Sequence, residues 1–145
     1  MSDIANLFIG TRVLTVDAVD VGWLKGDILY TPSPIINERK KGIPLYTVNR
    51  NISEVSAKLT ASIVEFSSGN LGKFVLSGAV SGASLTVYVV VVTITNTKTG
   101  KVLTISFPQA NIIPTGTINL GETTYIIDGI EIVLVGNVMP SVTVV

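Results

Sequence analysis

The stretch RNISEVSAKLTASIVEFSSGNLGKFVL, residues 50–76, decides how the rest of the chain is interpreted. From Glu54 to Phe66 its residues alternate in character. The apolar set is Val55, Ala57, Leu59, Ala61 and Ile63, and the polar set is Glu54, Ser56, Lys58, Thr60 and Ser62. A period of two predicts one long β-strand with one face buried and the other in water.

A short helix is predicted directly after this strand. Ser67-Ser68 offers a typical helix N-cap, and Leu71, Phe74 and Val75 follow at helical spacing. Gly78 ends the pattern. We expect this segment, Ser68 to Leu76, to be the main helical element, because the remaining sequence has the character of strands and loops.

The other predicted strands give a mainly β protein. They are Arg12–Val21, Asp27–Tyr30, Leu85–Asn96, Lys101–Phe107, Glu122–Val135 and Val138–Val145. Residues 97–100 (TKTG) predict the turn of a hairpin, Pro108 is expected to end a strand, and Gly129 is a candidate β-bulge. The expected fold is an antiparallel β-sandwich or barrel with one short flanking α-helix and a long extended loop.

The composition favours one domain whose surface is partly covered by other molecules. The 145 residues, 1–145, suit a single domain with a real core. Charged residues make up only 14%, the formal net charge is zero, and the mean hydropathy is +0.59. So little charge on so small a chain indicates contact with further copies or partners. The alternative is a monomer with a surface rich in Val and Thr.

The residue inventory argues against an enzyme. The chain has no Cys and no His, which excludes disulfides, thiolate or histidine metal sites and the usual general base at neutral pH. Two carboxylate pairs remain, Asp17 with Asp20 and Asp128 with Glu131. On regular strands the members of each pair point to opposite faces, so neither makes a catalytic dyad. We expect no catalytic residue, no cofactor and no metal.

The segment from Thr31 to Asn49 differs from its surroundings. It has three prolines and a basic run, Arg39-Lys40-Lys41, yet it keeps apolar residues that a disordered linker would lack. The residues of interest are Ile35, Ile36, Arg39, Lys40, Lys41, Ile43, Leu45 and Tyr46. We expect an extended, hairpin-like loop that contacts a partner; the basic run is more typical of a solvated tip than of a phosphate site.

The sequence predicts neither a membrane-spanning helix nor a signal peptide. The most apolar run, Leu85 to Ile94, is shorter than the roughly 20 residues that a membrane helix needs, and its β-branched residues favour a buried strand. The N-terminus lacks the pattern of a signal peptide. Residues 1–10 are either an arm that docks on a neighbour or an edge segment.

The order of these features resembles that of the tail tube (major tail) proteins of tailed bacteriophages, which are related to the inner tubes of contractile injection systems. The resemblance covers about 120 residues. Its motifs are the glycine-broken turn Asp20–Asp27, the long loop Thr31–Asn49, the strand ending Ile63-Val64-Glu65-Phe66 with Asn70-Leu71 in the following helix, and the connector Ile105–Pro114 (ISFPQANIIP).

This resemblance implies a structural virion protein, assembled in the host cytoplasm and located in the tail. Six copies would form a ring, and stacked rings would form a channel that holds viral DNA and a tape-measure protein without sequence-specific binding. A tail sheath is a further partner in contractile tails. The loop Thr31–Asn49 would reach the next ring, and Glu54, Ser56, Lys58, Thr60 and Ser62 would face the lumen.

Two other classes explain parts of the same pattern. Another virion β-protein, such as a tail terminator, head-completion or capsid decoration subunit, would share the composition. A monomeric ligand-binding β-sandwich would usually present aromatic residues on one face. Here one Trp, four Tyr and four Phe are scattered along the chain.

Overall fold

The protein is described from a computed structural model, which covers residues 10–22, 24–64, 71–121 and 125–145. These residues are mainly β, as the sequence predicts, with one helix. The strands are β1 Gly10–Val16, β2 Val19–Asp20, β3 Leu24–Pro32, β4 Ile35–Lys41, β5 Tyr46–Glu54, β6 Ala57–Ile63, β7 Tyr88–Asn96, β8 Val102–Leu120, β9 Tyr125–Leu134 and β10 Ser141–Val144, and the helix is α1 Leu71–Phe74.

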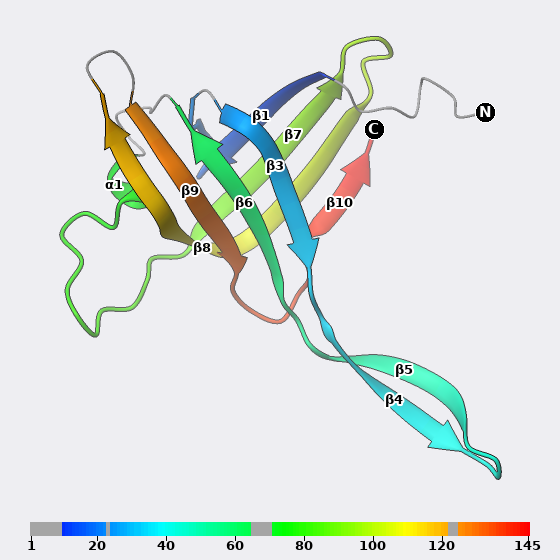
Figure 1. Cartoon of the computed structure of the whole chain (residues 1–145). Helices are drawn as coiled ribbons and strands as arrows, with labels where there is room; N and C mark the ends of the chain where they lie inside the picture. Colours follow the sequence, from blue (N-terminus) through cyan, green and yellow to red (C-terminus); the bar gives the residue numbers. More distant parts are fainter. Residues whose placement is uncertain (1–9, 23, 65–70, 122–124) are drawn as a thin grey trace.

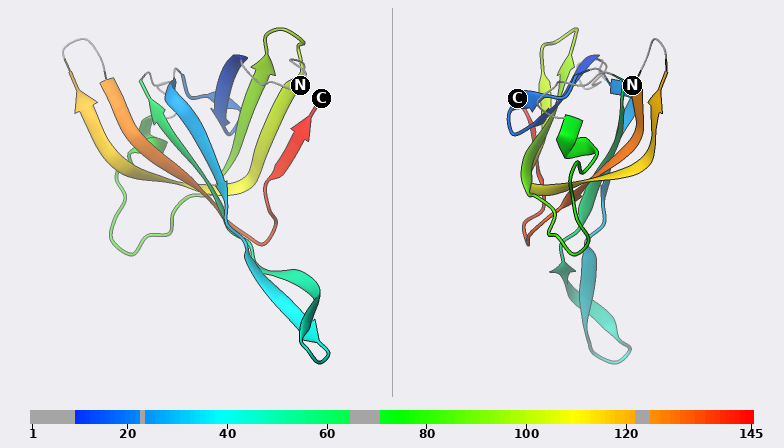
Figure 2. Two further views of the ribbon diagram at one scale, coloured as in Figure 1. Left: turned by 45° about the vertical axis from the view of Figure 1, so that its right-hand side comes forward. Right: turned by 90° about the vertical axis from the view of Figure 1, so that its left-hand side faces the viewer.

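Eight strands form one antiparallel sheet, which we call the body. Its order is β2-β1-β7-β8-β9-β6-β3, and β10 also pairs with β8. The 19-residue strand β8 uses its first half to pair with β7 and β10 and its second half to pair with β9. Because β8 bends, the two halves of the sheet face each other like the arms of a V (Figures 1 and 2). The result is a sandwich whose two layers share a strand.

The core lies between the two arms. Strand β6 shows the reason most clearly, because its residues alternate strictly between buried and partly exposed. Phe74 of α1 is fully buried and brings the helix into the same cluster. Its other fully buried large side chains are Leu14, Val16, Val21, Leu59, Ile63, Val90, Phe107, Ile112, Ile127, Ile130 and Ile132.

The long strand predicted from Glu54 to Phe66 is interrupted. β5 ends at Glu54 and β6 begins at Ala57, because pairing of the opposite chain segment also stops, between Pro32 and Ile35. Pro32 and Pro34 have no N–H to donate, so a continuous ladder cannot form there. Between the two ladders, Ser33 donates its N–H to the carbonyl of Ser56 at 2.9 Å and its hydroxyl to the Ser56 hydroxyl at 3.4 Å.

Three other expectations need correction. Arg12–Val21 is not one strand: it turns at Asp17-Ala18, whose φ angles of 51° and 66° suit a two-residue hairpin turn. The helix spans four residues, Leu71–Phe74, and the proposed cap Ser67-Ser68 lies outside the described residues. Pro108 does not end a strand, because β8 continues to Leu120 and accommodates the proline where its register with β7 shifts.

The hairpin between β7 and β8 is confirmed. Gly100 adopts a φ of 74° in the turn, as the sequence predicts. The side-chain oxygen of the buried Asn96 accepts hydrogen bonds from the N–H groups of Lys98 and Thr99 at 2.9 and 3.3 Å. This side chain therefore stabilises the turn by accepting hydrogen bonds from two of its backbone N–H groups.

The central position of Ala61 gives a test of the packing. Ala61 is 3% exposed and lies on the core face of β6. Ala61→Asp should prevent folding or lower the free energy of unfolding by several kcal/mol, since it buries a charge without a partner. Thermal unfolding followed by circular dichroism measures the effect.

A matched control places the same charge on the outside. Thr31 is exposed and lies opposite Lys58 across the β3–β6 pair. Thr31→Asp should change the free energy of unfolding by less than about 0.5 kcal/mol, because an exposed charge beside an opposite charge is tolerated. Equal effects of the two substitutions would contradict the assigned faces of the sheet.

Candidate functional site

The most distinctive surface is a β-hairpin that extends away from the body. Strands β4 and β5, residues 35–54, pair only with each other in the described structure, and the hairpin projects from the ends of β3 and β6 (Figure 1). Every residue of β4 is exposed, and in β5 only Thr47 is partly covered. The expected hairpin-like segment is therefore present, and it runs five residues beyond Asn49 to Glu54.

Large apolar side chains cover this hairpin although it contributes nothing to the core. Ile43 at the tip is fully exposed, and Leu45 beside it is 72% exposed. The others that are at least about half exposed are Ile35, Ile36, Tyr46, Val48 and Ile52. A two-stranded hairpin is at best marginally stable alone in water, and contiguous exposed apolar groups are typical of an interaction surface.

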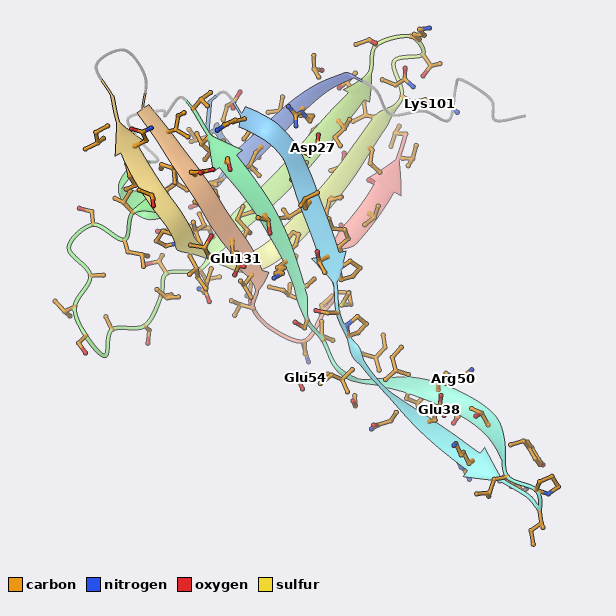
Figure 3. The ribbon with its side chains drawn as sticks, in the orientation of Figure 1. Asp27, Glu38, Arg50, Glu54, Lys101 and Glu131 are labelled. Atoms are coloured by element: carbon orange, nitrogen blue, oxygen red, sulfur yellow. The ribbon has the colours of Figure 1, made fainter. Side chains whose placement is uncertain are left out.

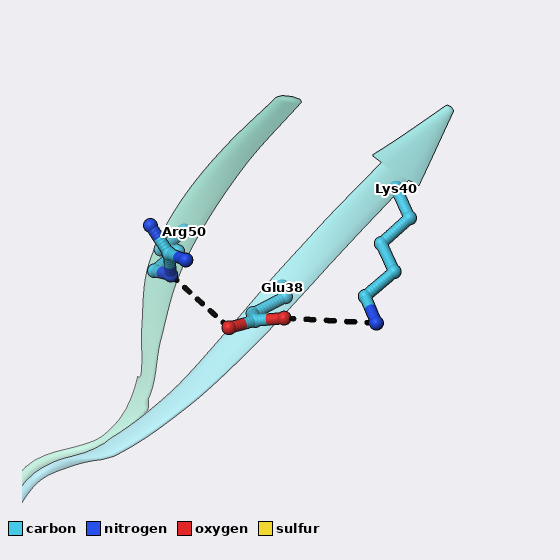
Figure 4. Close-up of polar contacts among 3 residues, drawn as sticks. All are labelled: Glu38, Lys40 and Arg50. Carbon is cyan, nitrogen blue, oxygen red and sulfur yellow. Dashed lines mark hydrogen bonds and ion pairs between the residues drawn. The ribbon is translucent and has the colours of Figure 1, made fainter. Parts of the chain in front are cut away.

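Charged side chains organise the middle of the hairpin. Glu38 lies opposite Arg50, and its Oε1 is 3.1 Å from Arg50 Nε (Figure 4). Its other oxygen is 4.0 Å from Lys40 Nζ. All three side chains are at least 41% exposed, so each pair is expected to contribute less than about 1 kcal/mol. The cluster is compatible with the observed register of the hairpin and has a net positive charge.

The tip is tightly folded around Gly42. This glycine has a φ of 92°, and a Cβ placed on it would lie 2.3 Å from Cε1 of Tyr46. The ring of Tyr46 therefore lies against the backbone of the turn. Glycine readily adopts this φ, and a larger residue would also displace the exposed Tyr46 ring.

The hairpin carries a net positive charge, although the chain as a whole is neutral. Residues 35–54 contain four basic side chains and two acidic ones, a net charge of +2. The whole chain is neutral, so the remaining residues sum to −2. The basic residues Arg39, Lys40 and Lys41 all lie near the tip. The predicted loop residues are thus brought together on one projection.

The second surface is the outward side of β6 and β9. Lys58, Thr60 and Ser62 point away from the core, as expected, because their neighbours in β6 are buried. Ser56 lies between β5 and β6 rather than in a strand. Glu54 ends the hairpin, far from Glu131 on the body (Figure 3). The prediction that five residues share one strand face is therefore wrong for Glu54 and Ser56, because both lie outside β6.

Asp128 and Glu131 join this surface, contrary to the expectation for a regular strand. Ile127 and Ile130 are both buried, because β9 contains a bulge at Gly129, where φ is 116°. The register of β6 with β9 shifts at the same place, between Ala61 and Ile63. The extra residue moves Asp128 to the outward side with Glu131.

The five outward residues Lys58, Thr60, Ser62, Asp128 and Glu131 form what we call the polar face. Lys58 Nζ lies 3.5 Å from Glu131 Oε1 across the strand pair. The Ser62 hydroxyl donates to Asp128 Oδ1 at 3.5 Å. The charges of these five residues sum to −1, and the exposed Lys25, which lies opposite Ser62 on β3, brings the sum on this side to zero. A surface without net positive charge binds a polyanion weakly.

Sequence reasoning missed two groups of residues. The bulge at Gly129 was recognisable, but its effect on the parity of Asp128 and Glu131 depends on which strand pairs with β9. Arg50 and Ile52 belong to the hairpin because they lie opposite Glu38 and Ile36. The alternating pattern that begins at Glu54 predicts one continuous strand, so it does not indicate the boundary between the hairpin and β6.

Two further features of the described residues are a hollow beside α1 and an aromatic pair. A hollow of about 210 Å³ lies beside α1, and the Lys73 ammonium at its wall is 3.7 Å from Asp17 Oδ2 and 5.2 Å from the centre of the Tyr88 ring. Tyr30 packs edge-on against Phe107 at a ring separation of 5.9 Å, and burial raises the pKa of its hydroxyl. No group of three or more carboxylates that could hold a metal is found among the described residues.

Comparisons with protein-family models, curated proteins and solved structures find no match for this chain. The one helix in the described part of the chain is too short to cross a membrane. The function is therefore inferred from the geometry of the hairpin and the polar face.

The bulge that builds the polar face depends on a close approach of two strands. A Cβ on Gly116 of β8 would lie 1.6 Å from the carbonyl oxygen of Asp128. Gly116→Ala should therefore lower the free energy of unfolding by about 1 to 3 kcal/mol or more, as expected for overpacking. Urea unfolding at equilibrium measures the loss.

Gly72 provides the control for this substitution. It lies in α1 without a positive φ, and its nearest contact for an added Cβ is 3.8 Å away. Gly72→Ala should leave stability unchanged or raise it by about 0.5 to 1 kcal/mol, because alanine favours the helix. If Gly116→Ala were as stable as the unaltered protein, the described pairing of β8 with β9 would be incorrect.

Proposed function

We propose that the chain is the subunit of a phage tail tube, a structural protein that assembles into rings and stacks them into a hollow tube. The observation that carries the proposal is the projecting hairpin, which exposes apolar residues on both strands and buries none of them in its own body. A hairpin of this kind requires a neighbouring molecule for cover. Stacked copies of the same chain provide that neighbour at every level.

The charge and form of the hairpin support head-to-tail stacking. Its net charge of +2 favours an acidic surface as its partner. A heterologous contact of this kind repeats along an axis instead of closing a pair. The proposal assigns the contact to Ile43, Leu45 and Tyr46, with Arg39, Lys40 and Lys41 around them.

The polar face supports the assignment of a channel wall. Its hydroxyl groups and paired charges hold few free cations, and each additional phosphate contact would slow the passage of DNA. We propose that Lys58, Thr60 and Ser62, together with Asp128 and Glu131, face the lumen. The occupants of the lumen are then viral DNA and, during assembly, a tape-measure protein.

The hairpin gives the direct test of the proposal. Ile36 and Ile52 lie opposite each other, so Asn37–Asn51 can be replaced by the two-residue turn Asn-Gly. The shortened chain should keep the thermal transition of the body but form separate rings instead of tubes. Negative-stain microscopy and sedimentation measure the assembly.

Asn51→Thr is the matched control, because it alters one polar residue of the hairpin and keeps its length. This variant should form tubes like the unaltered chain. Tubes of normal length from the shortened chain would remove the hairpin from stacking. A strictly monomeric unaltered protein at high concentration would contradict the whole proposal, and single rings that never stack would favour a tail terminator or head-completion subunit.

The position of the polar face can be tested separately with a cysteine. The chain has no native cysteine, and Thr60 lies at the centre of the polar face. In Thr60→Cys, a small maleimide should react with free subunits and tubes alike. A maleimide on a long polyethylene glycol chain should react with free subunits but only slowly with tubes, as measured by the gel shift.

The same variant before assembly is the control for intrinsic reactivity. The unaltered chain, which lacks cysteine, is the control for specificity. If tubes react with the large reagent as fast as free subunits, the polar face lies on the outside of the tube.

A further inference from the structure

Most strand edges in the described part of the body are protected against pairing. β2 has only two residues, and the part of β1 that it leaves uncovered, Gly10–Val13, contains the charged Arg12. The edge of β3 carries a bulge near Gly26, the charged residues Lys25 and Asp27, and a hydrogen bond from the Arg12 guanidinium to the Gly26 carbonyl. The free side of the second half of β8 is interrupted at Pro114 and Gly116. Short length, charges, bulges and prolines all discourage pairing with another chain.

Strand β10 has none of these devices. Its residues Ser141–Val144 contain no charge, proline or bulge, and it pairs on one side with β8 in regular register. All of its residues are exposed. The sequence SVTV is rich in β-branched residues, which favour extended pairing. β10 is therefore the edge of the body best suited to accept another strand.

The register identifies the free hydrogen-bonding groups. Val145 and Val102 exchange two backbone hydrogen bonds of 3.0 Å, so they form a hydrogen-bonded pair. In an antiparallel ladder such pairs alternate with pairs whose N–H and C=O groups point away. The backbone groups of Val142 and Val144 therefore point to the side of β10 that no described strand occupies.

The side chains of the same two residues present an apolar strip. Val142 lies opposite Ile105 and Val144 opposite Leu103, so both are on the core side of the sheet. Yet Val142 is 52% exposed and Val144 is 54% exposed. An added strand would bond to their backbone and cover their side chains in one step.

We propose that residues 1–9 of a second copy add to β10 as a strand. This segment, MSDIANLFI, is the apolar stretch that precedes β1. In an extended strand Ala5, Leu7 and Ile9 fall on one face, an apolar row that suits Val142 and Val144. The inference rests on the proposed function, since it supplies a contact between copies that the projecting hairpin does not make.

The strand order favours a second copy over the same chain. Gly10 begins β1, which is separated from β10 by β7 and β8. A strand added beyond β10 would lie four strand spacings from β1, about 19 Å. Residues 1–9 span at most about 30 Å, and crossing the sheet would use most of that length. A neighbouring copy avoids this crossing and leaves the whole segment free to pair.

Val144→Pro tests the edge directly in the full chain. Proline removes the outward N–H of Val144 but none of the hydrogen bonds to β8, so an edge strand tolerates it. The variant should unfold at nearly the temperature of the unaltered chain and lose ring formation in sedimentation velocity. Val144→Thr is the matched control, because it keeps the N–H and the β-branched shape and should assemble normally.

Cross-linking identifies the occupant without altering the edge backbone. Two single-cysteine chains, Leu7→Cys and Val145→Cys, are mixed and oxidised, and the procedure is repeated with Ala5→Cys and Ile9→Cys. At least one pairing should give a disulfide dimer, since a bridge needs Cα atoms within about 7 Å. Chains that carry both cysteines report pairing within one molecule as a cross-linked monomer.

Each result decides between the alternatives. Mixed dimers together with the loss of rings in Val144→Pro support the proposal. Cross-linked monomers alone, or no cross-link at any arm position, overturn it. Normal tubes from Val144→Pro also overturn it while leaving the tail-tube function intact. An unaltered chain that stays monomeric removes both.

Discussion

Backbone hydrogen bonds on both sides of β8 hold the two layers of this protein together. The first half of the strand bonds to β7 and β10, and the second half bonds to β9. No other described strand belongs to both arms of the V (Figure 2). The sandwich therefore depends on the bend of β8 and on the register shifts at Pro108 and near Gly116 that accompany it. Glycine is required where β8 meets the Asp128 carbonyl.

An interruption of backbone pairing separates the hairpin from the body. Pro32 and Pro34 cannot continue the β3 ladder, so pairing stops on both strands and begins again at Ile35 and Glu54. Beyond that interruption the chain has no core to cover. The exposed isoleucines of the hairpin therefore add nothing to the core of one chain, and the proposed contacts between copies would cover them.

The polar face and the β10 edge also expose groups that another molecule could contact. The polar face has paired charges and hydroxyl groups on β6 and β9. The β10 edge has outward backbone N–H and C=O groups. The proposed assembly would give each of the three surfaces, the hairpin included, a different use.

Much of the fold was determined by the sequence itself. The alternation in Ala57–Ile63, the TKTG turn and the bulge at Gly129 are local signals, set by side-chain periodicity and by the φ angles that glycine permits. The low charge and the absence of His and Cys excluded classes of chemistry in the same way. Only the tertiary structure decided where the Glu54 strand breaks, that Asp128 shares a face with Glu131, and which edge stays open. Those features depend on which strand lies opposite and in what register, and residues far apart in the sequence determine both.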